Sequence, residues 1–329
     1  MKAVNFNACG DPAQVLQVGE APVPEPGPGQ VRVRMIASPI NPSDLLQIRG
    51  EYGKRPKLPA TCGFEGVGVV EKSGGGLLGW RVRGRRVAVI NARGGNWAEY
   101  AVIPTRQAVP VPDDLPDEQV ACFFVNPATV IAMIEKVLCV PRGAWLIQTA
   151  AASALGKMIV KFGHHARFRT LNIVRRPESA AELRQLGADA VVDSSSEKLE
   201  DRVPAIVGTE GVRFGVDAVG GSLTGQVLDL LAPGGRLLNY GVLAGEAIRV
   251  PPRALIMGGR RLEGFWLSDW AGRQSPFTLW RLFRRIAALI RVGVLTTQVE
   301  RSYPLNEVQA AVRHASQPAR TGKILLRMN

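Results

Sequence analysis

The sequence predicts an α/β protein of two domains, a doubly wound parallel sheet and a second domain rich in β-strands. Its 329 residues exceed what one hydrophobic core usually organises, and 46% of them are hydrophobic, enough for two cores. The N-terminal part alternates short strands with Gly/Pro turns, whereas the middle alternates apolar strands with helical segments. We expect residues 1–117 and 270–329 to form the β-rich domain, and residues 118–269 to form the parallel-sheet domain.

The β-rich domain is predicted from Met1 to about Pro116. Turn segments such as PVPEPGPGQ separate short runs with strand character, which are MKAVNF, VRVRMIAS, GVGVVEKS, RVAVI and NWAEYAVI. Gly and Pro punctuate strands in this way because they adopt the dihedral angles of tight turns. An all-β lobe is the expected result.

The rhythm changes after VPDDLPDEQ. Helical segments now separate the apolar strands AWLIQTA, TLNIV, AVVD, FGVDAV and GRLLNYG. That alternation favours a parallel sheet with crossover helices. Beyond Trp270 we expect an amphipathic helix over residues 276–292, a strand, a helix starting near Pro304, and a closing strand GKILLRM that packs back on the first lobe.

The net charge of +13 comes mainly from arginine, since nine of the 41 basic residues are Lys and 41 − 9 leaves 32 Arg. Short clusters at residues 81–86 and 284–285 match no nucleic-acid motif, so no nucleic-acid partner is expected. The start MKAVNF lacks the pattern of a signal peptide, and no apolar run could span a bilayer. We expect a cytoplasmic protein without a membrane partner.

The four cysteines, Cys9, Cys62, Cys122 and Cys139, are isolated in the sequence. They lack the paired spacing of a zinc site or a disulfide framework. We expect all four to be reduced, buried core residues.

A small-residue turn follows the first apolar strand of the parallel-sheet domain. It reads AAASALG from Ala150 to Gly156, a degenerate form of the glycine fingerprint that places a dinucleotide pyrophosphate at a helix N-terminus. An ordinary close contact between helix and sheet is the alternative. The strands on either side favour cofactor binding.

The second strand, TLNIV, ends in Arg175 and Arg176, where NAD enzymes place an acidic residue for the ribose 2′-hydroxyl. Two guanidinium groups would instead pair with the 2′-phosphate of NADPH. The alternative is a pair of solvated arginines in a turn. The position favours NADPH as the cofactor.

The order of a β lobe, a dinucleotide fold and a short return segment resembles the medium-chain dehydrogenase/reductase superfamily, and INPSD (Ile40–Asp44) is similar to its zinc-free members. Three segments resemble the mitochondrial-type 2-enoyl thioester reductases: INPSDLLQIRGEYGKRPKLPATCGFEGVG, VNPATVIAMI and EGFWLSDW. Other parts are shared with quinone oxidoreductases. The resemblance implies a Rossmann NADP-binding domain and a GroES-like catalytic domain.

No metal site is expected. A catalytic zinc needs three close-set ligands and an open position, but the first lobe contains no histidine, and Phe64 stands where zinc-dependent relatives have His before Glu65. The histidines are His164, His165 and His314, and the first two are most simply helix-end residues.

Without a metal, reduction of a conjugated double bond needs hydride delivery and a proton donor. Tyr52, in the loop GEYGKRP, matches by resemblance the catalytic tyrosine that protonates Cα after hydride reaches Cβ. A surface-loop tyrosine packed on Pro56 is the alternative. Asp44 and Glu65 are expected to cap a turn or orient a neighbour, and neither is assigned a proton-transfer role.

The resemblance also implies a set of cofactor contacts. In chain order they are Asn126, Thr129, Ala152, Ser153, Ala154, Leu155, Tyr240, Gly241, Val242, Leu243, Phe265, Trp266, Leu267, Ser268 and Lys323. Ala152 and Ala154 depart from the family, which commonly has Asn and Gly at these positions. The departure bears on cofactor affinity and on the pose of the pyrophosphate.

The leading functional hypothesis is NADPH-dependent reduction of a 2-enoyl thioester. The alternatives are a quinone or general enone reductase and, from another class, an NADPH-binding protein that does no chemistry. The resemblance further implies a homodimer joined through edge strands of the parallel sheets, around Arg236–Tyr240 and Leu262–Trp266.

Overall fold

The computed structural model describes residues 1–318 and 320–328, which form two compact units. Unit 1 comprises Met1–Val125 and Trp280–Asn329, and unit 2 comprises Asn126–Leu279. The expected α/β class, with a GroES-like domain and a Rossmann-like domain, is confirmed. The domain ranges 1–117 with 270–329, and 118–269, stay a prediction.

Unit 1 is built around two sheets. Its elements are β1 (Lys2–Phe6), α1 (Pro12–Val15), β2 (Gln17–Glu20), β3 (Gln30–Pro39), α2 (Pro42–Arg49), β4 (Ala60–Thr61), β5 (Glu65–Ser73), α3 (Leu77–Val82), β6 (Arg86–Ile90), β7 (Tyr100–Pro104), η1 (Thr105–Gln107), β8 (Ala108–Pro110), α4 (Asp117–Ala121), most of α12 (Pro276–Arg291), β15 (Val299–Pro304), η4 (Leu305–Glu307), α13 (Val308–Ser316) and β16 (Lys323–Arg327).

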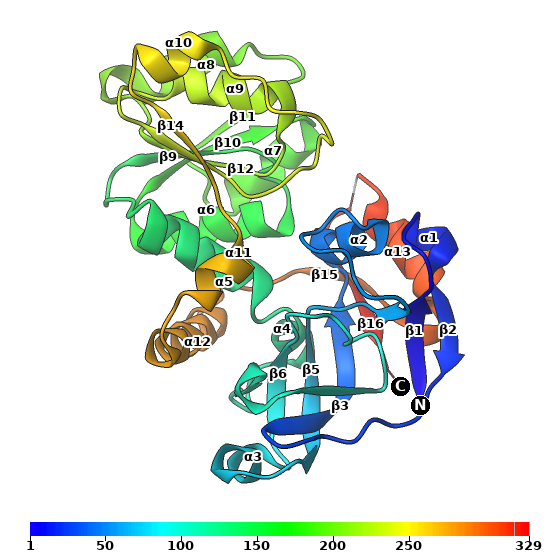
Figure 1. Cartoon of the computed structure of the whole chain (residues 1–329). Helices are drawn as coiled ribbons and strands as arrows, with labels where there is room; N and C mark the ends of the chain where they lie inside the picture. The colour runs from blue at the N-terminus through cyan, green and yellow to red at the C-terminus, as the bar shows by residue number, and fades with distance from the viewer. Residues whose placement is uncertain (319, 329) are drawn as a thin grey trace. The chain divides into compact units, whose positions relative to one another are not determined.

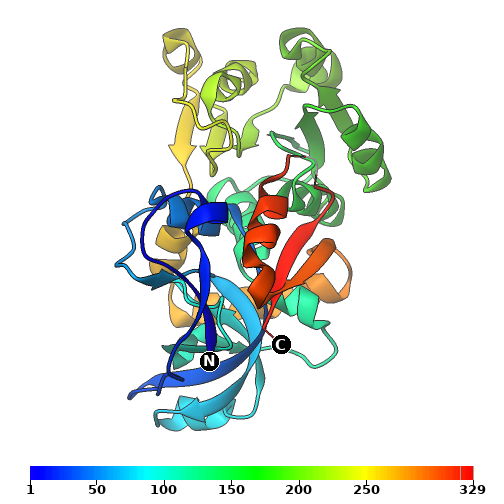
Figure 2. The same cartoon turned by 90° about the vertical axis from the view of Figure 1, so that its right-hand side faces the viewer.

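The larger sheet of unit 1 has the order β15-β16-β3-β5-β6-β8, with β7 also paired to β3. In β3, Val31, Val33 and Met35 are buried and alternate with Arg32 and Arg34, as expected for a strand with one face on the core. The closing strand β16 pairs antiparallel with β3, so the C-terminal segment completes the N-terminal lobe (Figures 1 and 2). The helix expected near Pro304 begins at Val308, because β15 continues to Pro304 and a 3₁₀ turn follows.

Unit 2 is a doubly wound sheet. Its elements are α5 (Val125–Ile131, with Val125 still in unit 1), the π-helical turn η2 (Ala132–Val137), β9 (Trp145–Gln148), α6 (Ala154–Ala166), β10 (Arg169–Val174), α7 (Glu178–Gln185), β11 (Ala190–Asp193), α8 (Leu199–Val207), η3 (Gly208–Glu210), β12 (Phe214–Asp217), α9 (Gly221–Leu230), β13 (Arg236–Asn239), α10 (Pro252–Ile256), β14 (Arg261–Gly264) and α11 (Leu267–Gly272).

The strand order of unit 2 is β11-β10-β9-β12-β13-β14, and every neighbouring pair is parallel. Helix α6 lies on one face of the sheet and α8 and α9 on the other (Figure 1). This double cover explains why β9 is buried along its whole length and reads as an unbroken apolar run ending in Gln148.

Two expectations are corrected. Strand β13 (Arg236–Asn239) is an inner strand, because β12 pairs on one side of it and β14 on the other, so of the two segments expected at the edge only β14 is there. Of the four cysteines, Cys62 and Cys122 are buried, but Cys9 is half-buried and Cys139 is exposed. Cys139 has a positive φ of 52° just beyond η2, where the chain turns outward.

Candidate active site

The carboxyl edge of the parallel sheet carries the elements of a dinucleotide site. From β9 the chain continues to β10 and β11 on one side of β9 in the sheet, and then returns to β12 on the other side of β9. The direction in which successive strands are added to the sheet therefore reverses between β9 and β12. Ligands of open α/β sheets bind beyond the strand ends at such a switch point. Gln148 ends β9 and Asp217 ends β12 at this place.

The turn after β9 is shaped by close packing. Ser153 is the N-cap of α6, and its Oγ accepts the Gly156 N–H at 3.1 Å. A Cβ on Gly156 would lie 2.4 Å from the carbonyl oxygen of Ala151, so only glycine fits there. The N–H groups of Ala154 and Leu155, in the first turn, have no acceptor within the helix. Such a terminus suits an anionic pyrophosphate.

Asp217 ties three strand ends together, and sequence analysis did not single it out. Its carboxylate accepts five hydrogen bonds, from Thr149 Oγ1 (2.5 Å), Thr224 Oγ1 (2.6 Å), Asn239 Nδ2 (2.9 Å), Val219 N (3.0 Å) and Gly220 N (3.1 Å). Thr149 follows β9 and Asn239 ends β13, so one buried carboxylate fixes the edge around the switch point. The signal was present in FGVD, where an acid ends an apolar strand.

Tyr240 follows β13, and its buried hydroxyl has no hydrogen-bond partner among the described residues. Burial, and then the charge of Asp217, raise the pKa of Tyr240, so the hydroxyl stays a donor. Buried polar groups nearly always have partners, so an unpaired hydroxyl at this strand end is unusual. The turn at Ser153, with the N–H groups that follow it and lack an acceptor within the helix, fits the pyrophosphate of a dinucleotide. Of the residues that follow Tyr240, Gly241 is half-buried, and Val242 and Leu243 are exposed.

The predicted residues for the 2′-phosphate lie beside this edge. Arg175 is exposed and Arg176 half-buried, directly after β10. Neither guanidinium pairs with an acidic side chain within residues 1–318 and 320–328, whereas Lys157 nearby pairs with Glu182 at 2.5 Å. Both arginines are therefore available to an anion.

The other predicted contacts of unit 2 lie on two elements. Asn126 is half-buried and Thr129 buried, both on α5. The segment Phe265–Ser268 follows β14, so it too leaves the carboxyl edge. Phe265 and Leu267 are half-buried, Ser268 is exposed, and Trp266, the residue preceding α11, is 48% exposed. Ala152 and Ala154 are half-buried and Leu155 is buried in the turn described above.

Tyr52 and Lys323 belong to unit 1. Helix α2 ends at Gly50 in the left-handed conformation, which starts the loop that carries Tyr52. Tyr52 is half-buried, and its ring centroid lies 5.4 Å from that of Phe64. Phe64, which stands where zinc-dependent relatives have a histidine, therefore packs against Tyr52, the predicted proton donor. The cofactor and catalytic roles of all these residues stay predictions.

A buried polar chain runs through unit 1. Lys323 Nζ donates to Asn41 Oδ1, and Asn41 Nδ2 donates to Glu65 Oε1 at 3.0 Å. Glu65 Oε2 accepts the backbone N–H groups of Phe124 (3.0 Å) and Val125 (2.9 Å) at the start of α5. Glu65 thus orients backbone, the role expected for it.

Asp44 belongs to the same cluster. Its carboxylate accepts the N–H of Asn41 at 2.8 Å and that of Phe64 at 3.1 Å, so it caps α2 as predicted. Burial, reinforced by the charge of Glu65, raises the pKa of Asp44 to about 7. Burial also raises the pKa of Glu65 and lowers that of Lys323. All three groups are at least nine-tenths buried, so their charges interact strongly.

Within the described residues, no group of three His, Cys, Asp or Glu side chains is arranged to hold a metal ion. His164 and His165 lie in the last turn of α6, as expected. In the same part of the chain, no helix has the length and apolarity needed to cross a bilayer.

Comparisons with known proteins agree with this architecture. Residues 27–113 match the alcohol dehydrogenase GroES-like domain, and residues 154–285 match the family described as zinc-binding dehydrogenase. The mitochondrial enoyl-[acyl-carrier-protein] reductase of Mus musculus is 33% identical over 332 residues, spanning 100% of this chain and 89% of the relative. The Homo sapiens protein of that name is 32% identical over the same shares. The Escherichia coli quinone oxidoreductase, solved in complex with NADPH, is 25% identical with a TM-score of 0.91, covering 99% of this chain and 100% of that one.

Proposed function

Since this chain belongs to the medium-chain dehydrogenase/reductase superfamily and is an NADPH-dependent oxidoreductase with enoyl reductase and quinone oxidoreductase relatives, we propose that it reduces the 2,3 double bond of 2-enoyl thioesters. The observation that carries the proposal is the full-length identity of about a third to enoyl-[acyl-carrier-protein] reductases. NADPH, when bound, supplies the hydride that reaches Cβ.

The protein supplies binding and the proton. Ser153, Ala154 and Leu155 bind the pyrophosphate through the start of α6, and Arg175 and Arg176 bind the 2′-phosphate. Tyr52 donates its hydroxyl proton to Cα as negative charge develops there, and its loop is framed by Gly50 and Gly53. Asn126, Thr129, Tyr240–Leu243, Phe265–Ser268 and Lys323 are proposed as further cofactor contacts. No metal takes part in this scheme.

The first experiment follows NADPH oxidation with a medium-chain trans-2-enoyl-coenzyme A, beside a quinone and with NADH in place of NADPH. We expect rapid enoyl turnover with NADPH. Turnover of the quinone alone would replace the proposal by an NADPH:quinone oxidoreductase, the function favoured by the likeness to the Escherichia coli enzyme. Cofactor binding with no turnover of either substrate would contradict both.

The proton donor is tested by Tyr52→Phe. Loss of general acid catalysis should lower kcat by about 10²–10⁴-fold while the ring contact with Phe64 is kept. Tyr100→Phe, which removes the hydroxyl of another half-buried tyrosine in unit 1, is the matched control and should leave kcat unchanged. Full turnover of Tyr52→Phe would exclude Tyr52 as the donor.

The cofactor preference is tested by Arg175→Ala combined with Arg176→Ala. Losing charge-assisted hydrogen bonds to the 2′-phosphate should raise KM for NADPH about 10–100-fold and leave KM for NADH unchanged. Arg184→Ala removes an exposed arginine from α7 and serves as the control. Equal effects on the two cofactors would assign the arginines another role.

Homodimerisation through β14, one of the two edge strands of the parallel sheet, remains part of the proposal, as does a cytoplasmic location. Light scattering of the purified chain measures the dimer directly. Persistent monomers at micromolar concentration would contradict it.

A further inference from the structure

An exposed apolar cluster surrounded by arginines stands apart from the candidate active site. On α3, Leu77, Leu78 and Trp80 are 76%, 61% and 75% exposed. Exposed arginines accompany them at positions 81, 83 and 85, and Arg106 lies on η1, which packs beside α3. We call these seven residues the α3 patch. Large apolar side chains this exposed mark an interaction site more often than a structural one.

The fold does not need the three apolar side chains. Helix α3 is held by its other face, where Val82 is buried and Gly79 packs so closely that a Cβ would lie 2.2 Å from Ser73 Oγ. The helix follows the turn of Gly74–Gly76 and lies beyond the ends of β5 and β6, at the margin of unit 1 (Figure 1). Leu77, Leu78 and Trp80 therefore face outward from a firmly seated helix.

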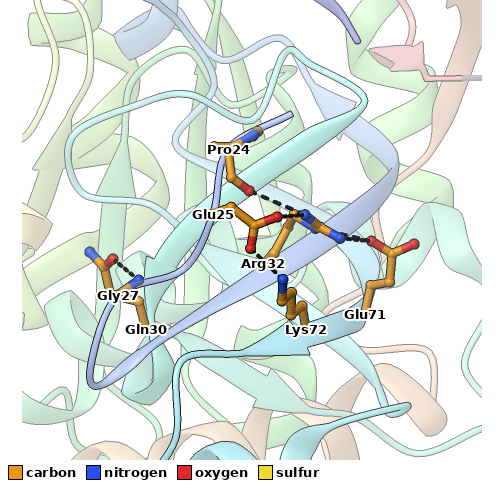
Figure 3. Close-up of polar contacts among 7 residues, drawn as sticks. All are labelled: Pro24, Glu25, Gly27, Gln30, Arg32, Glu71 and Lys72. Carbon is orange, nitrogen blue, oxygen red and sulfur yellow. Dashed lines mark hydrogen bonds and ion pairs between the residues drawn. The ribbon is translucent and has the colours of Figure 1, made fainter. Parts of the chain in front are cut away.

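Glu71, on the strand before α3, and Glu25 are both paired with basic side chains other than those of the α3 patch, as Figure 3 shows. Glu25 binds Arg32 at 2.9 Å and Lys72 at 2.6 Å, and Glu71 binds Arg32 at 2.8 Å. Residues 81, 83, 85 and 106 form no ion pair with an acidic side chain in the described part of the chain. The α3 patch thus combines apolar exposure with uncompensated positive charge.

A second apolar cluster provides a contrast. On and just after α10, Ile256 and Met257 are 79% and 84% exposed, and two of the nearby arginines lie against an acidic side chain. Arg253 and Arg260 both face Asp229, at 2.7 and 3.8 Å. Similar apolar exposure therefore occurs on this chain beside arginines that are paired, whereas the four arginines of the α3 patch are not paired among the described residues.

We propose that the α3 patch binds peripherally to an anionic lipid bilayer surface. A tryptophan and two leucines enter the boundary between headgroups and acyl chains, and the unpaired arginines contact lipid phosphates. The expectation of no membrane partner rested on the absence of a spanning segment, which a peripheral surface does not require. Nucleic acid fits less well, because residues 71–86 contain one aromatic ring and base-stacking surfaces use several.

The test is sedimentation of the full chain with vesicles of mixed phosphatidylglycerol and phosphatidylcholine, beside vesicles of phosphatidylcholine alone. We expect binding to the anionic vesicles that falls as salt is added. Leu77→Ser with Leu78→Ser and Trp80→Ser should weaken it by about tenfold or more. Arg81→Gln with Arg83→Gln and Arg85→Gln should remove the preference for anionic vesicles.

The control is Ile256→Ser with Met257→Ser, which removes comparable apolar exposure beside two arginines that pair with Asp229, and it should leave vesicle binding unchanged. Circular dichroism and the thermal midpoint check that each variant is folded. The proposal is overturned if the folded protein does not sediment with anionic vesicles, or if the α3 variants bind as well as the unaltered chain. Binding of single-stranded DNA, without vesicle binding, would assign the patch to nucleic acid instead.

Discussion

The buried carboxyl of Asp44 should make the stability of unit 1 depend on pH in an unusual direction. Burial raises its pKa from 3.8 to about 7, a difference that corresponds to about 4 kcal/mol. The folded state binds the proton more tightly than the unfolded state, so this contribution is complete below about pH 4 and is lost as pH rises through about 7. Ionisation of Asp44 thus opposes folding at neutral and alkaline pH.

The substitution Asp44→Asn isolates the effect, because the amide cannot ionise. Each oxygen of the Asp44 carboxyl group accepts one N–H, from Asn41 or Phe64, and either oxygen can accept whether or not the group is protonated. The NH2 of an asparagine cannot accept, so one of these hydrogen bonds is lost at every pH, at a cost of about 1–3 kcal/mol. The variant should be less stable than the unaltered protein near about pH 4 and more stable, by about 1–3 kcal/mol, near about pH 8.

Urea unfolding across this pH range measures the crossover as a difference between the two proteins, so that carboxyl groups common to both cancel. Asp113→Asn, which alters an exposed carboxyl, is the control and should run parallel to the unaltered protein. A stability difference between Asp44→Asn and the unaltered chain that stays constant from acid to alkaline pH would refute the reasoning.

Two further predictions concern the carboxyl edge of unit 2. Gly156→Ala places a Cβ 2.4 Å from the backbone oxygen of Ala151, so it should lower the free energy of unfolding by about 1–3 kcal/mol and weaken NADPH binding, measured by fluorescence titration. The control is Gly272→Ala, whose Cβ would have nothing within 4 Å and which should change neither quantity. Asp217→Asn disrupts a buried carboxylate that accepts five hydrogen bonds, so it should lower the free energy of unfolding by about 3 kcal/mol or more. Urea unfolding measures this, with Asp201→Asn at an exposed position as the control. Equal stabilities of the two variants would contradict the structural role of Asp217.

The two-domain architecture could be predicted because its signals are local. A parallel strand covered on both faces, such as Trp145–Gln148, appears as a short apolar run, and the turn that begins at Ala150 follows it directly in the sequence. The cap formed by Ser153 and the helix-end histidines depend on neighbours within one turn. Each could therefore be inferred from spacing alone.

The polar networks could not be predicted, because their partners are distant in sequence. Lys323 and Asn41 are 282 residues apart, and Thr149 and Asp217 are 68 apart. The order of strands in the sheet is likewise a tertiary property, so the sequence could not show that β13, expected at an edge by resemblance, lies inside the sheet. The exposure of Cys139 was not predicted either, because its position in the turn after η2, with a positive φ, is not visible in the composition of the segment.

The path of the chain through unit 1 has a consequence for biosynthesis. Strand β3 cannot complete its pairing until β16 is made, since Pro39 and Ala37 pair with Leu325 and Arg327. The same strand brings Lys323, the cation of the buried acidic cluster. Unit 2 is one continuous segment, so all of it has left the ribosome before unit 1 is complete. It can therefore fold while the first-made part of unit 1 still lacks its last strand. The part of the protein synthesised first is therefore the part finished last, and a chain that stops short of β16 would present an open sheet edge to the cell's quality control.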